Sequence, residues 1–299
     1  MVTSPPRTRA LLAVLVALAL LALAGCGAGS NPHPKSYDSY VAMGDSYTAI
    51  AGAGPFTDND CKRSTDNYPN LVAKALAVKN FTDASCGGAT TASLTGDQTL
   101  VSTGATRPPQ MQSLSKDTKL VTIGIGLNNN PNNQGSGSMS YALLYLCNRV
   151  AGILNPLCAT YLKLPNTTVI KAIDTVSKQV RSSLQDIRKA APNARIILVG
   201  YPRMLAEGSY CPAQLPMPDE AADRLRAAIK LVDQEWARIA KQTKVDYIDM
   251  YAASVGHDVC SSEPWVNGVN NIPGKALQFH PYAAYGQAVA DKIVALLKK

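Results

Sequence analysis

One serine of this chain stands where a nucleophile could act. The run YVAMGDSYTAI, residues 40–50, is apolar up to Gly-Asp-Ser, so Ser46 follows the end of a predicted strand. Parallel α/β sheets bind their ligands at the carboxyl ends of the strands. A serine hydroxyl there can attack a substrate if a base and donors to the developing oxyanion lie nearby.

Only three histidines are available as a base. His33 lies in an N-terminal stretch rich in Gly, Ser, Asn and Pro. His257 stands beside Cys260 in a loop and is interpreted as an exposed loop residue. His280 opens HPYAAYGQAVADKIVALLKK, with Pro281 suited to the first turn of a helix. His280 is therefore the candidate base for Ser46.

The elements that must bring these side chains together alternate along the chain. Short apolar runs predict strands at residues 40–43, near Phe81, and at 120–125, 195–199 and 245–250. Longer amphipathic runs predict helices at residues 70–77, 169–190, 220–241 and 283–297. This alternation predicts one domain, with a mostly parallel sheet covered on both faces.

The N-terminus has the layout of an export signal. Arg7 and Arg9 precede an uncharged apolar run at residues 10–24, so residues 1–25 are interpreted as a signal peptide. The run ends in Leu-Ala-Gly-Cys, which resembles the lipobox of bacterial lipoproteins and implies cleavage before Cys26 and acylation of its thiol. The alternative is a plain secretory signal. Residues 26–39 are then interpreted as a lipid anchor and a flexible tether, and residues 40–299 as the folded domain.

Charge and cysteine content also favour export. The formal charge of +8 falls to +6 without the two leader arginines, and the remaining basic residues are scattered, which does not favour nucleic-acid binding. Six cysteines remain besides Cys26, an even number, which indicates disulfides formed outside the cytoplasm, although 15 pairings are possible. The sequence has no CxxC pair, so no metal site is predicted.

Residues 131–164 interrupt the alternation of strands and helices. The segment begins as an Asn/Gly/Ser loop and continues as MSYALLYLCNRVAGILNPLCATYL, in which Arg149 is the one charged residue. One interpretation is a buried helical excursion linked by Cys147 and Cys158. The other is an apolar flap over an acyl-binding cleft.

Four blocks of the sequence, in order, are GDSYT, SCGGATT, VTIGIGLNN and FHPYAAYG. Together they resemble the SGNH/GDSL hydrolases, and in particular their secreted actinobacterial esterase and lipase branch, over residues 40–299. The resemblance implies a three-layer αβα sandwich with a flavodoxin-like, mostly parallel five-stranded sheet. The absence of a Gly-x-Ser-x-Gly sequence argues against the α/β-hydrolase elbow.

The resemblance also implies roles for individual residues. Ser46 would be the nucleophile and His280 its base. The oxyanion hole would consist of the backbone N–H of Ser46, the backbone N–H of Gly88, and the side-chain amide of Asn128. The adjacent Gly87 is the alternative candidate for this second backbone donor.

Two positions depart from the family pattern. Leu127 and Asn129 flank Asn128 where the family often has Gly and Asp, which changes the expected loop geometry. Leu277 stands three residues before His280, where many members carry an Asp. We therefore expect the backbone carbonyl of Leu277 to orient the imidazole, as in members that work as a Ser-His dyad. The alternative is a carboxylate from another loop, at Glu263, Asp258 or Asp249.

The same branch implies three sequential disulfides, which would pair Cys61 with Cys86, Cys147 with Cys158, and Cys211 with Cys260. Closing loops of such lengths stabilises a protein by about 2 to 4 kcal/mol each. The first would hold the loop of Ser46 to that of Gly88, and the third would brace the approach to His280.

The expected function is therefore that of a serine esterase or lipase, which hydrolyses carboxylic esters through an acyl-enzyme on Ser46. The nearly uncharged residues 139–146 favour fatty-acyl esters. The alternatives are a non-catalytic lipid- or glycan-binding module and an acyltransferase to envelope sugars. We expect a monomer without cofactor, either lipid-anchored through Cys26 on the outer face of the cytoplasmic membrane or secreted.

Overall fold

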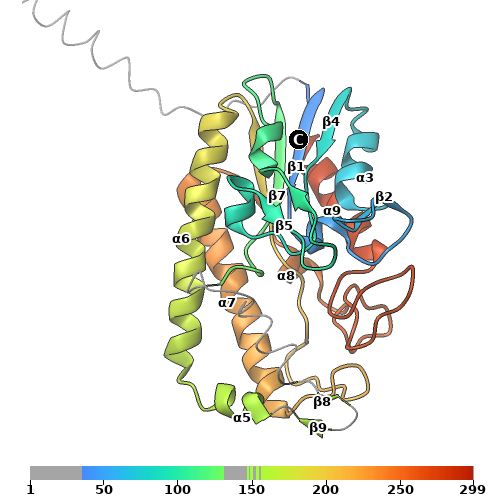
Figure 1. Cartoon of the computed structure of the whole chain (residues 1–299), viewed down its shortest axis with the longest axis vertical. Helices are drawn as coiled ribbons and strands as arrows, with labels where there is room; N and C mark the ends of the chain where they lie inside the picture. The colour runs from blue at the N-terminus through green and yellow to red at the C-terminus, as the bar shows by residue number, and fades with distance from the viewer. Residues whose placement is uncertain (1–35, 131–146, 148, 151–152, 155, 299) are drawn as a thin grey trace, which may run out of the picture. The chain divides into compact units, whose positions relative to one another are not determined.

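The computed structural model describes residues 36–130, 147, 149–150, 153–154 and 156–298 (Figure 1). The predicted signal peptide, Cys26 and most of the tether lie outside these residues. So does the apolar stretch at residues 139–146, on which the preference for fatty-acyl esters was based. Among the described residues, no helix is both long and apolar enough to span a bilayer.

Five parallel strands form the central sheet. They are β1 (Ser39–Gly44), β4 (Asn80–Asp83), β7 (Leu120–Gly124), β10 (Arg195–Val199) and β11 (Asp246–Ile248). Their order across the sheet is β11-β10-β7-β1-β4, and every neighbouring pair is parallel. Counted along the chain this is the flavodoxin-like order 2-1-3-4-5. The predicted fold class is confirmed.

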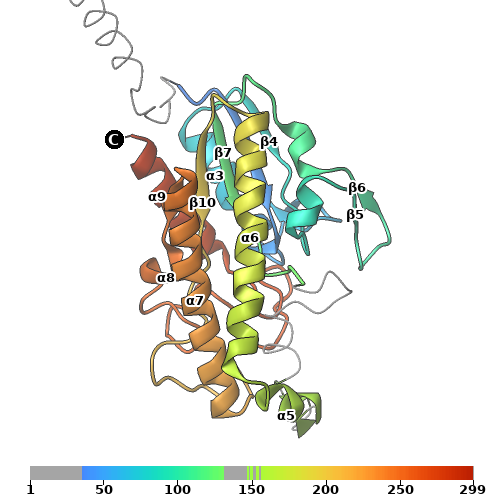
Figure 2. The same cartoon turned by 90° about the vertical axis from the view of Figure 1, so that its left-hand side faces the viewer.

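Helices cover both faces of this sheet (Figures 1 and 2). The two long helices, α6 (Asn166–Ala190) and α7 (Asp219–Thr243), pack on one face. The helices α3 (Tyr68–Ala75) and α9 (Ala283–Leu297) pack on the other. The result is the expected three-layer sandwich.

Alternation along each strand divides the core into two halves. In β1, Val41 and Met43 belong to the cluster packed with α6 and α7. Tyr40 and Ala42 belong to the cluster packed with α3 and α9. Successive side chains of a strand point to opposite faces, so strands buried on both sides are mostly apolar along their whole length. This is why the strand runs could be recognised in the sequence.

The predicted boundaries lie within three residues of the observed ones, and those of β10 and α9 agree with the prediction. The structure begins α3 at Tyr68, two residues earlier than expected, because the side chain of Asn67 accepts the N–H of Asn70 and caps the helix. It begins α9 at Ala283, with Tyr282 at the N-cap. The expectation that Pro281 lies in the first turn of this helix is therefore wrong; Pro281 pairs with Val266 in an isolated bridge before the helix.

Short elements connect the main ones. They are the helices α2 (Ser46–Ala49), α5 (Pro156–Leu162) and α8 (Met250–Ala253), the 3-10 turns Thr91–Leu94 and Gln110–Ser113, and the two-stranded ribbons β2 (Phe56–Asp58) with β3 (Arg63–Ser64), β5 (Gln98–Thr99) with β6 (Thr106–Arg107), and β8 (Arg149–Val150) with β9 (Ile153–Leu154). The predicted helical excursion at residues 131–164 is thus helical in α5, but it also contains the β8–β9 hairpin. The alternative, an apolar flap over the cleft, concerns mainly residues that the structure does not describe.

The described residues contain three disulfides, Cys61–Cys86, Cys147–Cys158 and Cys211–Cys260. These are the pairs that the family resemblance implies. They lie outside the central sheet. Except for Cys158, which lies in α5, their cysteines stand in connecting segments, so the bridges restrict parts of the chain that regular secondary structure leaves free.

Gly126 is the hinge between β7 and the loop that carries Asn128. Its φ is +126°, a conformation that residues with a side chain rarely adopt. The indole of Trp236 closes the space beside it and donates from Nε1 to the carbonyl of Ile125 at 3.1 Å. A Cβ on Gly126 would lie 2.5 Å from Cζ2 of Trp236. Through Trp236, helix α7 therefore fixes the direction in which the chain leaves β7 toward Asn128.

We predict that Gly126→Ala lowers the free energy of unfolding by about 2 to 4 kcal/mol, because backbone strain and overpacking add. Gly208→Ala is the matched control, since Gly208 also has a positive φ but an added Cβ would meet nothing within 4 Å. This control should lose about 1 kcal/mol, from strain alone. Urea unfolding of both variants checks the prediction, which fails if their losses are equal.

Candidate active site

Ser46 is the first residue of the one-turn helix α2, directly after β1. The carboxylate of Asp45 caps this turn by accepting the N–H of Tyr47 at 2.9 Å. The cap fixes the backbone on both sides of Ser46, whose side chain is only 6% exposed. The serine thus stands at the carboxyl edge of the sheet, as expected from its sequence context.

His280 meets Ser46 from the far end of the chain. Its Nε2 lies 2.9 Å from the Oγ of Ser46, although 234 residues separate the two. The backbone that carries His280 is held by the hydroxyl of Tyr47, which donates to the carbonyl of Phe279 at 2.7 Å. The residue after the nucleophile therefore also positions the residue before the histidine.

The carbonyl that orients the imidazole is that of Gln278, 2.7 Å from Nδ1, and not that of Leu277. The expectation for Leu277 is corrected because its carbonyl is already engaged. It accepts the side-chain amide of Asn267 at 2.9 Å and the N–H of His280 at 3.2 Å. The carbonyl two residues before His280, rather than three, is left to face the ring.

This contact fixes the tautomer of His280. A carbonyl oxygen can only accept, so Nδ1 carries the proton and Nε2 presents its lone pair to the hydroxyl of Ser46. A carboxylate orienter is thereby ruled out at Nδ1. Two of the alternatives act elsewhere: Asp249 accepts the N–H of Ala252, and Asp258 accepts that of Cys260. For Glu263, the backbone carbonyl lies 2.8 Å from Nδ1 of His257.

His257 does not join the site. It is half-buried rather than exposed, and its ring stacks on that of Trp265 with centroids 4.2 Å apart. Its Nδ1 pairs with the carbonyl of Glu263. These contacts give it a structural role in the loop that precedes His280.

Burial shifts the pKa values of the two titratable groups beside Ser46 in opposite directions. Burial lowers the pKa of His280, and the carbonyl of Gln278 opposes this effect in part. Burial also raises the pKa of Asp45, from 3.8 to about 7, against hydrogen bonds from Tyr201 and Tyr47 that favour the carboxylate. The imidazole is therefore a neutral base at pH 7.

Tyr201 connects two loops of the site and was not identified from the sequence. Its hydroxyl donates to Oδ2 of Asp45 at 2.5 Å and accepts the N–H of Leu127 at 3.4 Å. It stands just after β10, the neighbour of β7, so parallel pairing brings it level with the loop of Asn128. A tyrosine two residues beyond a strand end was the only signal in the sequence.

Gly88 and Asn128 lie in two loops that touch. Asn128 donates from Nδ2 to the carbonyl of Ala89 at 3.1 Å, so one of its two amide hydrogens is used. Gly88 has a φ of +75° and is exposed. The side chain of the neighbouring Asn129 is buried and accepts the N–H of Thr91 at 3.0 Å, which ties the same two loops together.

A cavity of about 510 Å³ opens beside the Ser46 hydroxyl. Its described lining includes Ser46, Gly88 and His280, but not Asn128. The other lining residues are Ala51, Asp60, Lys62, Gly87, Thr90, Ala92, Ser93, Asp97, Gln98, Thr99, Leu100, Val101, Ser102 and Leu277. Another cavity of about 510 Å³ lies between α6 and α7 and contains none of the predicted site residues. The first cavity is therefore the one that contains the predicted nucleophile and base.

Comparison with known proteins agrees with this geometry. Residues 42–287 match the model of the GDSL-like Lipase/Acylhydrolase family. The chain belongs to this family. It is accordingly a carboxylic ester hydrolase, and the family resemblance noted in the sequence is confirmed.

Curated relatives are similar over most of their length. Lipase 2 of Streptomyces coelicolor is 30% identical over 272 residues, which cover 86% of this chain and 85% of the relative. An esterase of Streptomyces scabiei is 30% identical over 288 residues, with 86% and 83% covered. The crystal structure of an extracellular lipase from Streptomyces rimosus has a TM-score of 0.65 at 24% identity, covering 86% and 98%. At that identity the structural likeness concerns the fold alone.

The buried carboxyl of Asp45 predicts a pH dependence of stability. Its pKa in the folded chain lies above its ordinary value, so between about pH 4 and pH 7 the native state holds a proton that the unfolded state releases. This contribution to stability is present at low pH and is lost as the pH rises through 7. We predict that, relative to Asp45→Asn, the wild type loses on the order of 4 kcal/mol between pH 4 and pH 8.

Urea unfolding across that pH range measures the difference. Asp117→Asn, which removes an exposed aspartate, is the control and should follow the wild type. Parallel curves for wild type and Asp45→Asn would show that Asp45 is ionised throughout, which would contradict the prediction.

Proposed function

We propose that this chain hydrolyses fatty-acyl esters through a Ser46–His280 dyad. The observation that carries the proposal is the 2.9 Å contact between the Oγ of Ser46 and an Nε2 that presents its lone pair. Nucleophile and base are within hydrogen-bond reach at the mouth of a cavity, as nucleophilic catalysis requires.

In the first half-reaction, the oxygen of Ser46 attacks the ester carbonyl while His280 takes its proton at Nε2. The imidazolium then gives this proton to the departing alcohol, which leaves an acyl group on Ser46. In the second half-reaction His280 takes a proton from water, the hydroxide attacks the acyl-enzyme, and the proton returns to Ser46 as the acid departs. Gln278 holds the ring through both halves, but its carbonyl stabilises the imidazolium less than a carboxylate would.

Three donors are proposed for the oxyanion. The backbone N–H groups of Ser46 and Gly88 reach it from the nucleophile turn and the neighbouring loop. Asn128 supplies the amide hydrogen that Ala89 does not use. Such fixed dipoles stabilise the tetrahedral intermediate without reorganisation, and each is worth roughly 3 kcal/mol.

The cavity lining supports an ester with an apolar acyl part and a polar alcohol part. Leu100, Val101 and Leu277 offer apolar contacts for an acyl chain. Lys62 and Asp97 lie in the same lining and suit a polar leaving group. A fatty acid linked to a polar alcohol therefore fits this site better than a wholly apolar ester.

The proposed location is outside the cytoplasm. The three disulfides require an oxidising compartment, and the sequence before residue 26 has the layout of an export signal. We propose that the chain is anchored by a lipid on Cys26 or is secreted.

We predict that Ser46→Ala lowers kcat for p-nitrophenyl esters at least about 10⁴-fold, because no nucleophile remains. Ser102→Ala removes a second serine hydroxyl from the same cavity and is the control; it should keep kcat within about threefold. A series of p-nitrophenyl esters with acyl chains from acetyl to palmitoyl measures the preference for acyl-chain length. Equal activity of Ser46→Ala and wild type would refute the mechanism.

Two further arms separate the rival functions. A fluorophosphonate probe should label the wild type and leave Ser46→Ala unlabelled, whereas a binding module would not be labelled at all. With an alcohol acceptor present, an acyltransferase would release a new ester instead of the free acid.

We predict that kcat/KM declines on the acid side with a midpoint below pH 6.5, because burial lowers the pKa of His280 and the protonated ring cannot act as base. Above that pH this group should cause no further change. The pH profile of Asp45→Asn separates the titration of Asp45 from that of His280. A midpoint above 6.5 would indicate a carboxylate partner and contradict the dyad.

A further inference from the structure

The turn that carries Gly88 has a defined type. The N–H of Ala89 donates to the carbonyl of Cys86 at 3.1 Å, and Gly88, the third residue of this four-residue turn, has a φ of +75°. Because Gly87, the second residue, does not have a positive φ, this is a type II turn and not a type I′ turn. The type I turn differs from it mainly by a half-rotation of the central peptide, here the bond between Gly87 and Gly88.

This rotation decides whether the oxyanion meets a donor or an acceptor. In a trans peptide the carbonyl of Gly87 and the N–H of Gly88 point in opposite directions. Because neither glycine has a side chain, the Gly-Gly sequence can adopt both turn types at little cost. If the peptide rotated, an oxygen would replace the N–H of Gly88. A group outside the turn is therefore needed to select the orientation.

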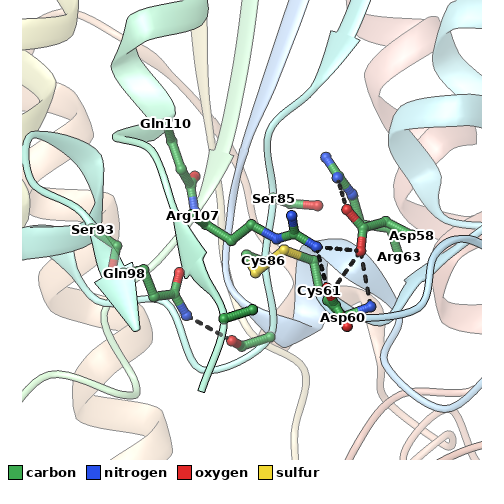
Figure 3. Close-up of a disulfide and its surroundings, with 12 residues drawn as sticks. Asp58, Asp60, Cys61, Arg63, Ser85, Cys86, Ser93, Gln98, Arg107 and Gln110 are labelled. Atoms are coloured by element: carbon green, nitrogen blue, oxygen red, sulfur yellow. Dashed lines mark hydrogen bonds and ion pairs between the residues drawn. A yellow bond between two sulfur atoms is a disulfide. The ribbon is translucent and has the colours of Figure 1, made fainter. Parts of the chain in front are cut away.

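Gln98 is placed to make this selection. Its Nε2 donates to the carbonyl of Gly87 at 2.8 Å, the contact drawn beside the disulfide in Figure 3. The other peptide group of the turn is held from the disulfide loop, since the N–H of Gly87 donates to the carbonyl of Cys61 at 2.9 Å. The Gly88 N–H has no partner among the described residues and is left for the substrate.

The strand that carries Gln98 is itself fastened to the disulfide loop. In the β5–β6 ribbon Gln98 pairs with Arg107, whose guanidinium contacts Asp60 at 2.6 Å and Asp58 at 3.4 Å (Figure 3). The carboxylate of Asp58 also accepts the N–H of Cys61 at 2.9 Å. The strand that carries Gln98 and the Gly87–Gly88 turn are therefore both attached to the Cys61 loop, which keeps Gln98 in place relative to the turn.

We propose that Gln98 is a positioning residue of the oxyanion hole: it holds the Gly87 carbonyl and so keeps the N–H of Gly88 directed at the reacting oxygen. The proposal rests on the proposed role of Gly88 in ester hydrolysis. The Gln98 side chain makes no bond to the oxyanion in this scheme and acts only through the peptide.

Two variants test the proposal. Gln98→Leu removes the donor at similar size, and kcat should fall about 10- to 100-fold because one oxyanion donor is partly lost, while KM stays within about threefold. The kcat of Gln98→Glu should fall further. A carboxylate repels the Gly87 carbonyl and attracts the Gly88 N–H, so it favours the rotated peptide. Thr106→Ala is the control and should keep kcat within about threefold, since Thr106 is exposed on the paired strand β6 and lies outside the cavity lining.

An alkyl boronic acid provides a second readout, since it forms a tetrahedral anion on Ser46. Its inhibition constant should rise by the same factor as kcat falls, with the melting temperature unchanged. A loss of kcat with unchanged boronate affinity would indicate a merely structural role and overturn the proposal, as would wild-type kcat in both Gln98 variants.

The outcome for Gln98 is distinguishable from that for the proposed function. If Ser46→Ala abolishes hydrolysis and the Gln98 variants do not affect it, the function stands and the positioning role falls. If the wild type hydrolyses no ester, crystal structures of the two variants still decide the geometry. A Gly87 carbonyl in the wild-type orientation in both would refute the proposal.

Discussion

The contact between Ser46 and His280 is the interaction on which the rest of the site depends. The two residues are 234 positions apart and meet because the helical turn after β1 and the segment before α9 arrive at the same edge of one parallel sheet. Each loop is held by the other through Tyr47, whose hydroxyl binds the carbonyl of Phe279. The geometry of the pair is therefore a property of the sheet and its capping loops, and not of either residue alone.

The imidazole in this site is oriented without a charged partner. A carbonyl at Nδ1 fixes the ring and the tautomer but leaves the imidazolium less stabilised, and burial adds to that cost. The donors on the opposite side of the reaction centre therefore matter more. In the proposed mechanism, a site that gains less from its base depends more on the accurate placement of the N–H groups that face the oxyanion, one of which the Gly87–Gly88 turn would supply.

The sequence allowed much of the fold and part of the site to be predicted, for physical reasons. Strands buried on both faces must be apolar, so β1, β7 and β10 could be read directly, and the position of Ser46 after β1 followed from parallel topology. Caps such as Asn67 and the bridge at Pro281 shifted boundaries that periodicity does not define.

Contacts made by single backbone atoms could not be predicted. Whether Leu277 or Gln278 faces His280 depends on which carbonyl the Asn267 amide engages first, and that is decided by tertiary packing. Tyr201 and Gln98 were missed for the same reason. Tyr201 bonds to Asp45 and Leu127, which are distant in sequence, and Gln98 bonds to Gly87, 11 residues before it; neither residue belongs to a recognisable local pattern.

The Cys61–Cys86 bridge has a consequence for when the enzyme becomes competent. It joins the segment before α3 to the segment after β4, and the second of these runs directly into the Gly87–Gly88 turn. Before the thiols are oxidised, that turn lacks its covalent restraint. If the chain is exported as proposed, the turn gains this restraint only on passage into an oxidising compartment. A newly made chain in the reducing cytoplasm would then be a weaker catalyst, and the producing cell's own esters would be spared.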